Sequence, residues 1–228
     1  VLFVSIIISF YSICISSYPI SFETAIDIVW KNINGFKFQT YVDRLESSII
    51  WDSHLPMAIG ALTVGGIMGV GGSVMQTIIR NPVADPYTTG ISSGALFGVT
   101  IFIILGAGFT GIGYELGMMI NAFFFSMIPV AIIVVFSIFR KVTPTVMVLI
   151  GIAVMYVFSA MTTLLKFTAS DDEISTIYAW SVGTLGGVGW QDASVLLLAF
   201  AFALVASMLL ANKLNLLTTG DESTRSLG

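Results

Sequence analysis

Few side chains in this 228-residue chain are of a type that could carry catalysis or bind a metal. His54 is the single histidine and Cys14 the single cysteine, which excludes an internal disulfide and a site with several thiolate ligands. Asp171, Asp172 and Glu173 could offer oxygen ligands to a hard cation. The same acids also suit the first turn of a helix, where negative charge is favourable, and we favour this second interpretation. No catalytic, cofactor or metal site is therefore expected.

Two glycine-rich strings, GVGG at 69–72 and GTLGG at 183–187, have the composition of loops that hold phosphate groups. A phosphate loop ends in Gly-Lys-Ser/Thr, and neither string is followed by that sequence. The chain is therefore not expected to be an enzyme, and any ATP hydrolysis would belong to another polypeptide.

The most unusual stretch is RNPVADPYTTGISSGALFG, residues 80–98. Arg80-Asn81-Pro82 predicts a helix end, because a cation suits a helix C-terminus and the residue before proline resists helical geometry. Asp85-Pro86 predicts the next helix start, with an acidic N-cap and proline at the first helical position. Small residues follow at once: Gly90, Ser92, Ser93, Gly94, Ala95 and Gly98. The stretch is therefore predicted to be a rigid corner joining two tightly packed helices. Gly65, Gly69 and Ser73, four residues apart, predict close helix packing before it.

The elements that position these residues are expected to be membrane-spanning helices. Hydrophobic residues make up 56% of the chain and charged residues 10%, against about 25% charged in soluble domains. Roughly 20 apolar residues in a helix cross a bilayer, and five stretches without charge fit: 55–79, 88–110, 116–139, 145–165 and 193–211. Uninterrupted apolar runs exclude the alternating pattern of a barrel. An all-α polytopic transmembrane bundle follows, with His54 in an interfacial loop.

Residues 1–15 form a sixth apolar stretch, which is short. It could be the core of a signal peptide, but it lacks the basic residues that precede such a core. We favour a first span whose N-terminal end is missing. If that span enters from the cytoplasm, residues 80–87, 140–144 and 212–228 are cytoplasmic, and they are the denser in lysine and arginine.

Five motifs in order along the chain resemble the FecCD/BtuC-type permeases, the membrane subunits of ABC importers for iron-siderophores, haem and vitamin B12. They are GGSVMQTIIRNPVADPYTTGISSGA, IIWDSHLPMAIGAL, VLIGIAVMYVFSAMTTLL, YAWSVGTLGGVGW and NKLNLLTTGDESTRSLG. The family's structural signature then falls on Gln76, Arg80, Asn81, Pro82, Asp85, Pro86, Gly90, Ser93 and Gly94.

The resemblance implies a fold of roughly ten spans, of which residues 1–228 would be the N-terminal part with about six. The chain would then be a fragment or the product of a split gene. It would sit in the cytoplasmic membrane as a homodimer, docked to two ATPase subunits that use ATP. An extracytoplasmic binding protein would deliver a ferric siderophore, haem or cobalamin for import.

The resemblance also implies three functional segments. A cytoplasmic gate would lie at Thr143, Pro144 and Thr145, although Thr143 before Pro144 also fits an ordinary N-cap. The outer turn facing the substrate would contain Trp180, Gly183 and Thr184. The last segment would form short helices that couple to the ATPase, or else an ordinary solvated tail, and its residues are Gly220, Asp221, Glu222 and Arg225.

An ion-coupled secondary transporter of small solutes is the alternative. Such carriers place ionisable residues inside the membrane as relays and ion sites, and the five clear stretches contain none. Coupling to an external ATPase is therefore favoured.

Overall fold

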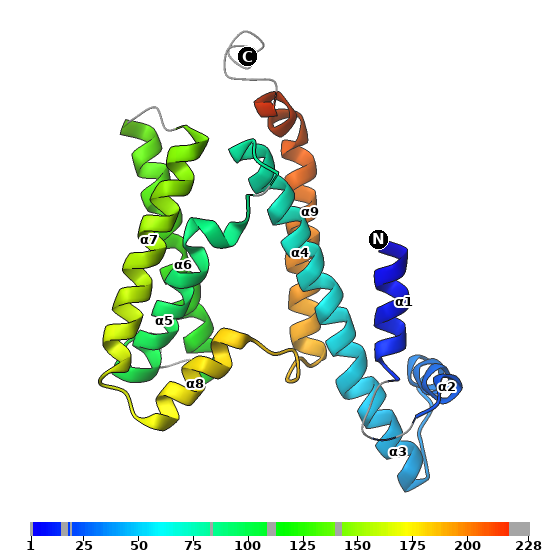
Figure 1. Ribbon diagram of the computed structural model, residues 1–228. Coiled ribbons are helices and arrows are strands. Elements are labelled where there is room, and N and C mark those ends of the chain that lie inside the picture. Colours follow the sequence, from blue (N-terminus) through cyan, green and yellow to red (C-terminus); the bar gives the residue numbers. More distant parts are fainter. Residues whose placement is uncertain are drawn as a thin grey trace. The chain divides into compact units, whose positions relative to one another are not determined.

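The computed structural model describes residues 2–14, 18, 20–82, 84–108, 113–139 and 143–218 (Figure 1). Its helices, in chain order, are α1 (Leu2–Ser12), α2 (Phe22–Ile33), α3 (Tyr41–Ser47), the π-helix η1 (Ser48–His54), α4 (Leu55–Ile79), the 3-10 helix η2 (Pro86–Thr89), α5 (Ile91–Leu105), α6 (Tyr114–Phe139), α7 (Pro144–Lys166), α8 (Asp171–Val182) and α9 (Trp190–Thr218). No strand occurs in these described ranges. The predicted all-α class is confirmed.

Four described helices are long and apolar enough to cross a membrane: Tyr41–Ile79, Tyr114–Phe139, Pro144–Lys166 and Trp190–Leu216. The predicted span at 88–110 is wrong in length, because α5 has 15 residues. At about 1.5 Å per residue it is roughly 22 Å long, less than the hydrocarbon core of about 30 Å. Gly90 (φ 83°) and Gly106 (φ 61°) stop it at both ends, since both adopt the left-handed conformation.

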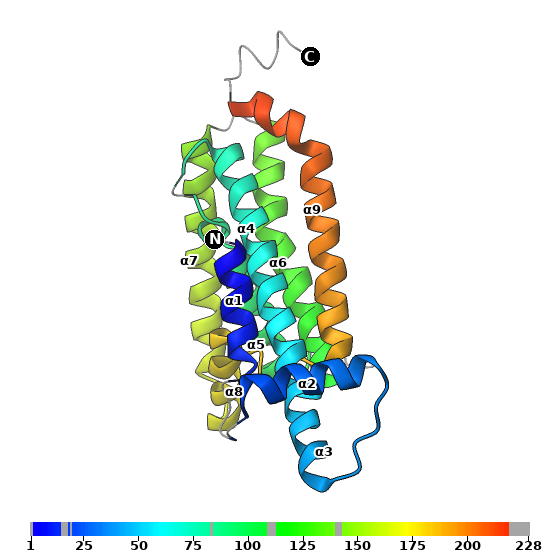
Figure 2. The same cartoon turned by 90° about the vertical axis from the view of Figure 1, so that its right-hand side faces the viewer.

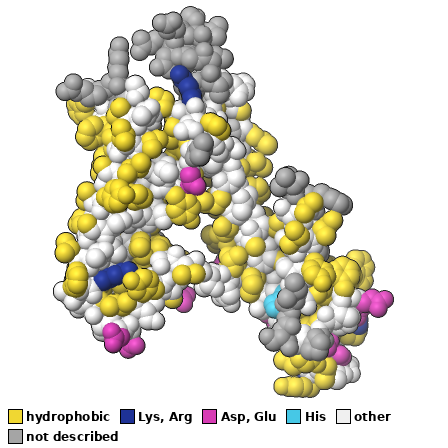
Figure 3. Space-filling model, in the orientation of Figure 1, with side chains coloured by type: hydrophobic (Ala, Val, Ile, Leu, Met, Phe, Trp, Pro, Cys, Tyr) yellow, Lys and Arg dark blue, Asp and Glu magenta, His cyan; other side chains and the backbone are white. Residues whose placement is uncertain are grey.

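Large apolar side chains are exposed along these helices, as the hydrophobic surface in Figure 3 shows. Phe123 and Val134 of α6 and Leu164 of α7 are more than half exposed in the isolated chain. A water-soluble protein rarely carries apolar surface on this scale, so these faces fit contact with lipid or with other membrane segments.

The chain divides into two compact units, with boundaries inside α4 and α9. The first unit contains residues 1–70 and 184–210, and the second contains residues 71–183 and 211–228.

In the first unit, α3, η1 and α4 form one continuous helix, where the sequence predicted a loop before residue 55. Pro56 has no N–H to donate to the carbonyl four residues back. The π-helix accommodates this, because the N–H of Leu55 donates to the carbonyl of Ile50, five residues back. His54 therefore lies in a helix rather than a loop, and its Nδ1 hydrogen-bonds the carbonyl of Ile13 at 2.8 Å.

Helices α4 and α9 approach each other in the first unit through glycines other than those predicted. A Cβ at Gly66 would lie 2.6 Å from the ring of Phe200, and one at Gly60 would lie 3.2 Å from Val188. A Cβ at Gly65 or Gly69 would meet no atom within 4 Å. The glycines that contact the neighbouring segment are therefore Gly60 and Gly66, whereas the sequence predicted Gly65 and Gly69.

The second unit is built around α5, which packs against α6 and α7. Phe97 of α5 lies between two rings, with centroid distances of 5.5 Å to Phe125 of α6 and 5.4 Å to Phe158 of α7. Helix α8 returns to pack on α5 at the far end of α7 (Figure 1).

The acidic cluster is the first turn of α8, as predicted. Ser170 is the N-cap, and Glu173 completes a capping box by accepting the backbone N–H of Ser170 at 2.7 Å. This hydrogen bond lowers the pKa of Glu173. In the described part of the chain, no group of three His, Cys, Asp or Glu residues is placed to hold a metal ion.

Replacing Ser170 with alanine removes the cap and is expected to destabilise α8 by about 1 kcal/mol. A lowered carboxyl pKa stabilises the folded state above the usual carboxyl range, and the effect is lost as the pH falls through the lowered value. Glu173→Ala should therefore lower the melting temperature in detergent at neutral pH but not at strongly acidic pH. Ser175→Ala, on an exposed position of the same helix, is the control. A decrease in melting temperature for Ser175→Ala as large as that for Ser170→Ala would contradict the capping role of Ser170.

Candidate functional site: the signature turn and its seat

The signature turn, residues 80–90, begins where α4 ends at Ile79. The N–H of Arg80 donates to the carbonyl of Thr77 (3.3 Å), and the N–H of Asn81 donates to that of Gln76 (3.1 Å). These two bonds form a Schellman motif, which satisfies carbonyls at the helix end. Arg80 occupies the left-handed position with φ 53°, where glycine is usual and another residue costs on the order of 1 kcal/mol. The predicted helix end at Arg80-Asn81-Pro82 is confirmed.

Asp85 starts the second half of the turn as the predicted N-cap. Its side chain accepts the N–H of Tyr87 at 2.6 Å, and Pro86 takes the first helical position. The helix that it caps is the single turn η2, rather than the start of a span. Gly90 then reverses the chain into α5, and the Ser93 hydroxyl donates to the carbonyl of Gly90 at 2.8 Å.

The turn is seated on α7 by direct backbone contact. A Cβ at Gly151 would lie 2.6 Å from the carbonyl oxygen of Thr88 and 2.8 Å from the Cα of Thr89. A Cβ at Gly90 would lie 3.1 Å from the carbonyl oxygen of Gly151. Only the absence of side chains at both glycines allows this approach.

The seat corrects the predicted position of the corner. Gly151 lies seven residues after Pro144, so it is about 10 Å along an α7 that is roughly 33 Å long. Figure 1 shows α5 beginning partway along α6 and α7 rather than at their end. The signature turn therefore contacts α7 about 10 Å from the start of that helix. The sequence had predicted a corner at the cytoplasmic end of the helices.

Helix α5 then packs on α6 through the small residues that follow the turn. A Cβ at Gly94 would lie 2.7 Å from the carbonyl oxygen of Phe125, and one at Gly98 would lie 2.7 Å from that of Asn121. The close packing predicted for these small residues is confirmed, and their partner is α6.

Asn121 locks this contact with a buried amide. Its Nδ2 donates to the carbonyl of Gly98 at 2.9 Å and to that of Ala107 at 3.2 Å. The second bond satisfies a carbonyl beyond the C-terminal end of α5. In the sequence, Asn121 is a polar residue and Gly151 a small residue within apolar stretches. Nothing nearby in the chain indicates which helix either residue contacts, so the sequence did not identify their role.

The predicted gate residues lie at the beginning of α7. Thr143 is the N-cap, its hydroxyl accepting the N–H of Val146 at 3.4 Å, and Pro144 takes the first position. The N-cap interpretation is confirmed. Thr145 is exposed, and its role in gating stays a prediction.

The predicted outer residues lie beyond the other end of α7. Trp180 is half-buried on α8, and Gly183 ends that helix with φ 75°. The Thr184 hydroxyl accepts the N–H of Gly186 at 3.0 Å. Because a 23-residue helix separates the start of α7 from α8, Trp180 and Gly183 lie far from Thr143–Thr145 within the second unit, as two sides of a membrane require.

The four predicted coupling residues lie outside the described residues: Gly220, Asp221, Glu222 and Arg225. Their role stays a prediction.

Long apolar helices and exposed apolar faces define a multi-pass membrane protein of the cell membrane. A model of the FecCD transport family matches residues 3–228, and the chain belongs to that family. The predicted family is confirmed.

Individual relatives agree with this assignment. The permease protein of the iron(3+)-hydroxamate import system of Bacillus subtilis is 30% identical over 96% of this chain and 54% of its own length. The molybdate import permease of Haemophilus influenzae is 28% identical over 98% of this chain and 64% of its own length. The chain thus spans between half and two thirds of the length of these curated relatives.

A solved transporter assigned to the metal-chelate type of ABC transporters, in an inward-facing conformation, has the same fold. The TM-score is 0.79 at 24% identity, and the match covers 100% of this chain and 66% of that one.

Proposed function

We propose that the chain works as part of a permease subunit of an ATP-binding-cassette importer and moves a metal chelate inward across the cytoplasmic membrane. The observation that carries the proposal is the seat of the signature turn at Gly151, about 10 Å along α7, in a chain of the FecCD family. Non-helical backbone at membrane depth is tolerated where it is buried in protein or lines a water-filled cavity.

The signature turn has the character of a cavity lining. Asp85 and Tyr87 are exposed in the described chain; the backbone of Asp85 is extended, and Tyr87 lies in the single-turn helix η2. Contact with lipid would leave polar groups without partners at a cost of several kcal/mol each. The turn is therefore assigned to a water-accessible route, together with the neighbouring face of α7. This extends the pathway predicted for Thr143–Thr145 and for Trp180–Thr184.

The driving force is assigned to an external ATPase. Within the described helices α4, α5, α6 and α7, charged side chains are limited to terminal turns, at Glu115 and Lys166, and the signature turn between α4 and α5 adds Arg80 and Asp85. A proton- or ion-coupled carrier needs ionisable groups nearer the centre of the membrane. The ion-coupled alternative is therefore not favoured.

The partners follow from the proposed class of transporter. They are two ATP-binding-cassette subunits, an extracytoplasmic substrate-binding protein and a second permease subunit. Gly220, Asp221, Glu222 and Arg225 would contact the ATPase. This chain would hold no cofactor of its own.

The cargo is assigned to bulky chelates such as ferric siderophores, haem or cobalamin. A route lined mainly by hydroxyl and small residues, with Asp85 of the signature turn as an exposed charge, has no cluster of metal ligands in the described chain and suits a molecule that already encloses its metal. The relative that carries iron(3+)-hydroxamate supports this class. The molybdate relative makes a small oxyanion the competing cargo to be tested.

The complete transporter, reconstituted in liposomes with its partner subunits, is expected to take up a radiolabelled ferric hydroxamate when ATP is supplied on the cytoplasmic side. An ATPase subunit unable to hydrolyse ATP is the matched control and should abolish uptake. Uptake that follows a proton gradient and ignores ATP would contradict the proposed mechanism. ATP-driven uptake of molybdate with none of the chelates would contradict the cargo assignment while leaving the mechanism intact.

A further inference from the structure

Helix α2 of the first unit has three faces of different character, which none of the functional segments explains. One face joins the protein core, where Ala25 and Ile28 are buried with Ile13 and Ile50. Asn32 secures this face, because its Nδ2 donates to the hydroxyl of Ser47 on α3 at 2.9 Å.

A second face of α2 is apolar and uncovered in the described chain. Phe22, Ile26, Trp30 and Ile33 recur at the spacing of one helix face and are between 52% and 67% exposed. Two of the four are aromatic, and tryptophan is enriched where the hydrocarbon meets the headgroups.

The third face of α2 is charged. It carries Glu23, Asp27 and Lys31, and a 2.5 Å salt bridge joins Lys31 to Asp27. A surface helix with one apolar face and one charged face is typical of helices that lie in the plane of a membrane interface.

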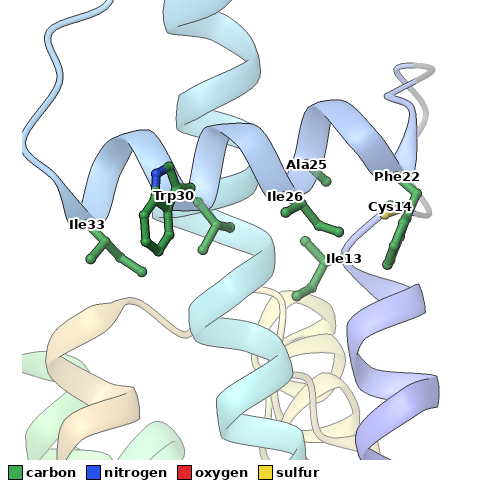
Figure 4. A pocket seen from close by; sticks show the side chains of 8 residues that line it. Ile13, Cys14, Phe22, Ala25, Ile26, Trp30 and Ile33 are labelled. Atoms are coloured by element: carbon green, nitrogen blue, oxygen red, sulfur yellow. The ribbon is translucent and has the colours of Figure 1, made fainter.

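The orientation of α2 agrees with such a position. Figure 2 shows α2 lying across the direction of α1 and α4. In Figure 4 the side chains of Ile26, Trp30 and Ile33 point along α4 toward its membrane-spanning part, on the side where α1 lies. Helix α3 extends in the opposite direction (Figure 1). The apolar face of α2 is thus turned toward the expected hydrocarbon core. Helix α3, which follows α2 in the chain, extends away from that core.

The apolar face also borders a groove at the end of α1. The groove has a volume of about 160 Å³, and Ile13, Cys14, Phe22, Ala25 and Val29 contribute to its walls (Figure 4). The groove therefore joins the apolar face of α2 to the residues that directly follow α1. Helix α1 itself carries exposed apolar residues, Val4, Ile7, Ile8 and Tyr11.

We propose that α2 lies in the membrane interface with its apolar face among lipid acyl chains, and that the groove holds part of one acyl chain. The partner is a lipid surface of zwitterionic headgroups, because the charged face carries two acids and one lysine and gives no attraction to anionic lipid. The occupant is lipid rather than protein because α2 lies across the direction of α4 and turns its apolar face, which contains Trp30, toward the expected hydrocarbon.

The test uses spin labels in the full protein, reconstituted in phosphatidylcholine vesicles. Cys14→Ser removes the one thiol of these 228 residues, any further native cysteine of the full protein is also replaced with serine, and single cysteines then carry the label. Ile26→Cys and Ile33→Cys probe the apolar face, and Glu23→Cys and Asp27→Cys are matched controls on the charged face. Labels at 26 and 33 should collide with oxygen, which concentrates in lipid, and lose their collisions with a water-soluble nickel complex. Labels at 23 and 27 should show the reverse.

Nickel collisions at 26 and 33 equal to those at 23 and 27 would overturn the proposal, because the apolar face would then lie in water. Loss of collisions with both reagents at 26 and 33 would overturn it as well, because a protein would then cover the face. Neither outcome depends on the cargo or on ATP.

Discussion

Gly151→Ala is expected to push the signature turn off its seat on α7. The new Cβ would lie 2.6 Å from the carbonyl oxygen of Thr88, a contact with backbone that cannot swing aside as a side chain can. Overpacking of this kind costs about 1–3 kcal/mol. We expect a lower melting temperature in detergent, a lower yield of monodisperse protein and a loss of transport.

Gly72→Ala is the matched control, since a Cβ at Gly72 in α4 would meet no atom within 4 Å. Alanine is a better helix former than glycine, so this variant should be neutral or more stable by up to about 1 kcal/mol. If Gly151→Ala and Gly72→Ala have the same melting temperature, the signature turn does not rest on α7 as described.

Asn121→Asp is expected to have the second large effect, although the new side chain is nearly the same size. It replaces the donor that faces the carbonyls of Gly98 and Ala107 with a negatively charged acceptor. A charge at the centre of a spanning helix costs about 2.5–3.5 kcal/mol on insertion scales, and this range is an upper value for Asn121, which lies about 10 Å along α6. Most of the folded protein should be lost at neutral pH, and acidic pH should restore part of it, because a protonated carboxyl can donate one hydrogen bond.

Asn121→Leu separates the lost hydrogen bonds from the added charge. It should cost about 1–2 kcal/mol and show no recovery at acidic pH. Ser137→Ala on the same helix is the control, because the Ser137 hydroxyl donates to Ile133 of its own helix and holds no neighbour. Equal stability of all three variants would contradict the role of Asn121 as a link between α5 and α6.

The sequence predicts the local chemistry of this chain well, because caps and helix ends depend on a few neighbouring residues. Asp85 and Thr143 cap helices where expected, and the chain leaves α4 at Arg80. Spans free of charge identify the membrane class, and motif order identifies the family.

The partners of small residues could not be predicted in the same way. Gly65 and Gly66 are adjacent and chemically identical, and the register of α9 decides that Gly66 meets Phe200. The depth of α5 depends on the complementary gap at Gly151, 61 residues further along the chain than Gly90. The π-helix before Pro56 could not be predicted either, because a loop before the proline would be equally compatible with the local sequence.

The claim that the signature turn lines a water-filled pathway is tested most directly by thiol labelling of Tyr87→Cys in the complete transporter, on a background in which Cys14 and any other native cysteine are replaced with serine. The side chain of Tyr87 is 59% exposed in the described chain. A water-soluble, membrane-impermeant reagent is expected to label position 87 in at least one nucleotide state, and to label Thr145→Cys at the predicted gate. Phe123→Cys on an exposed apolar face of α6 should stay unlabelled throughout. Failure to label position 87 in every nucleotide state, while position 145 reacts, would show that the turn does not line the pathway.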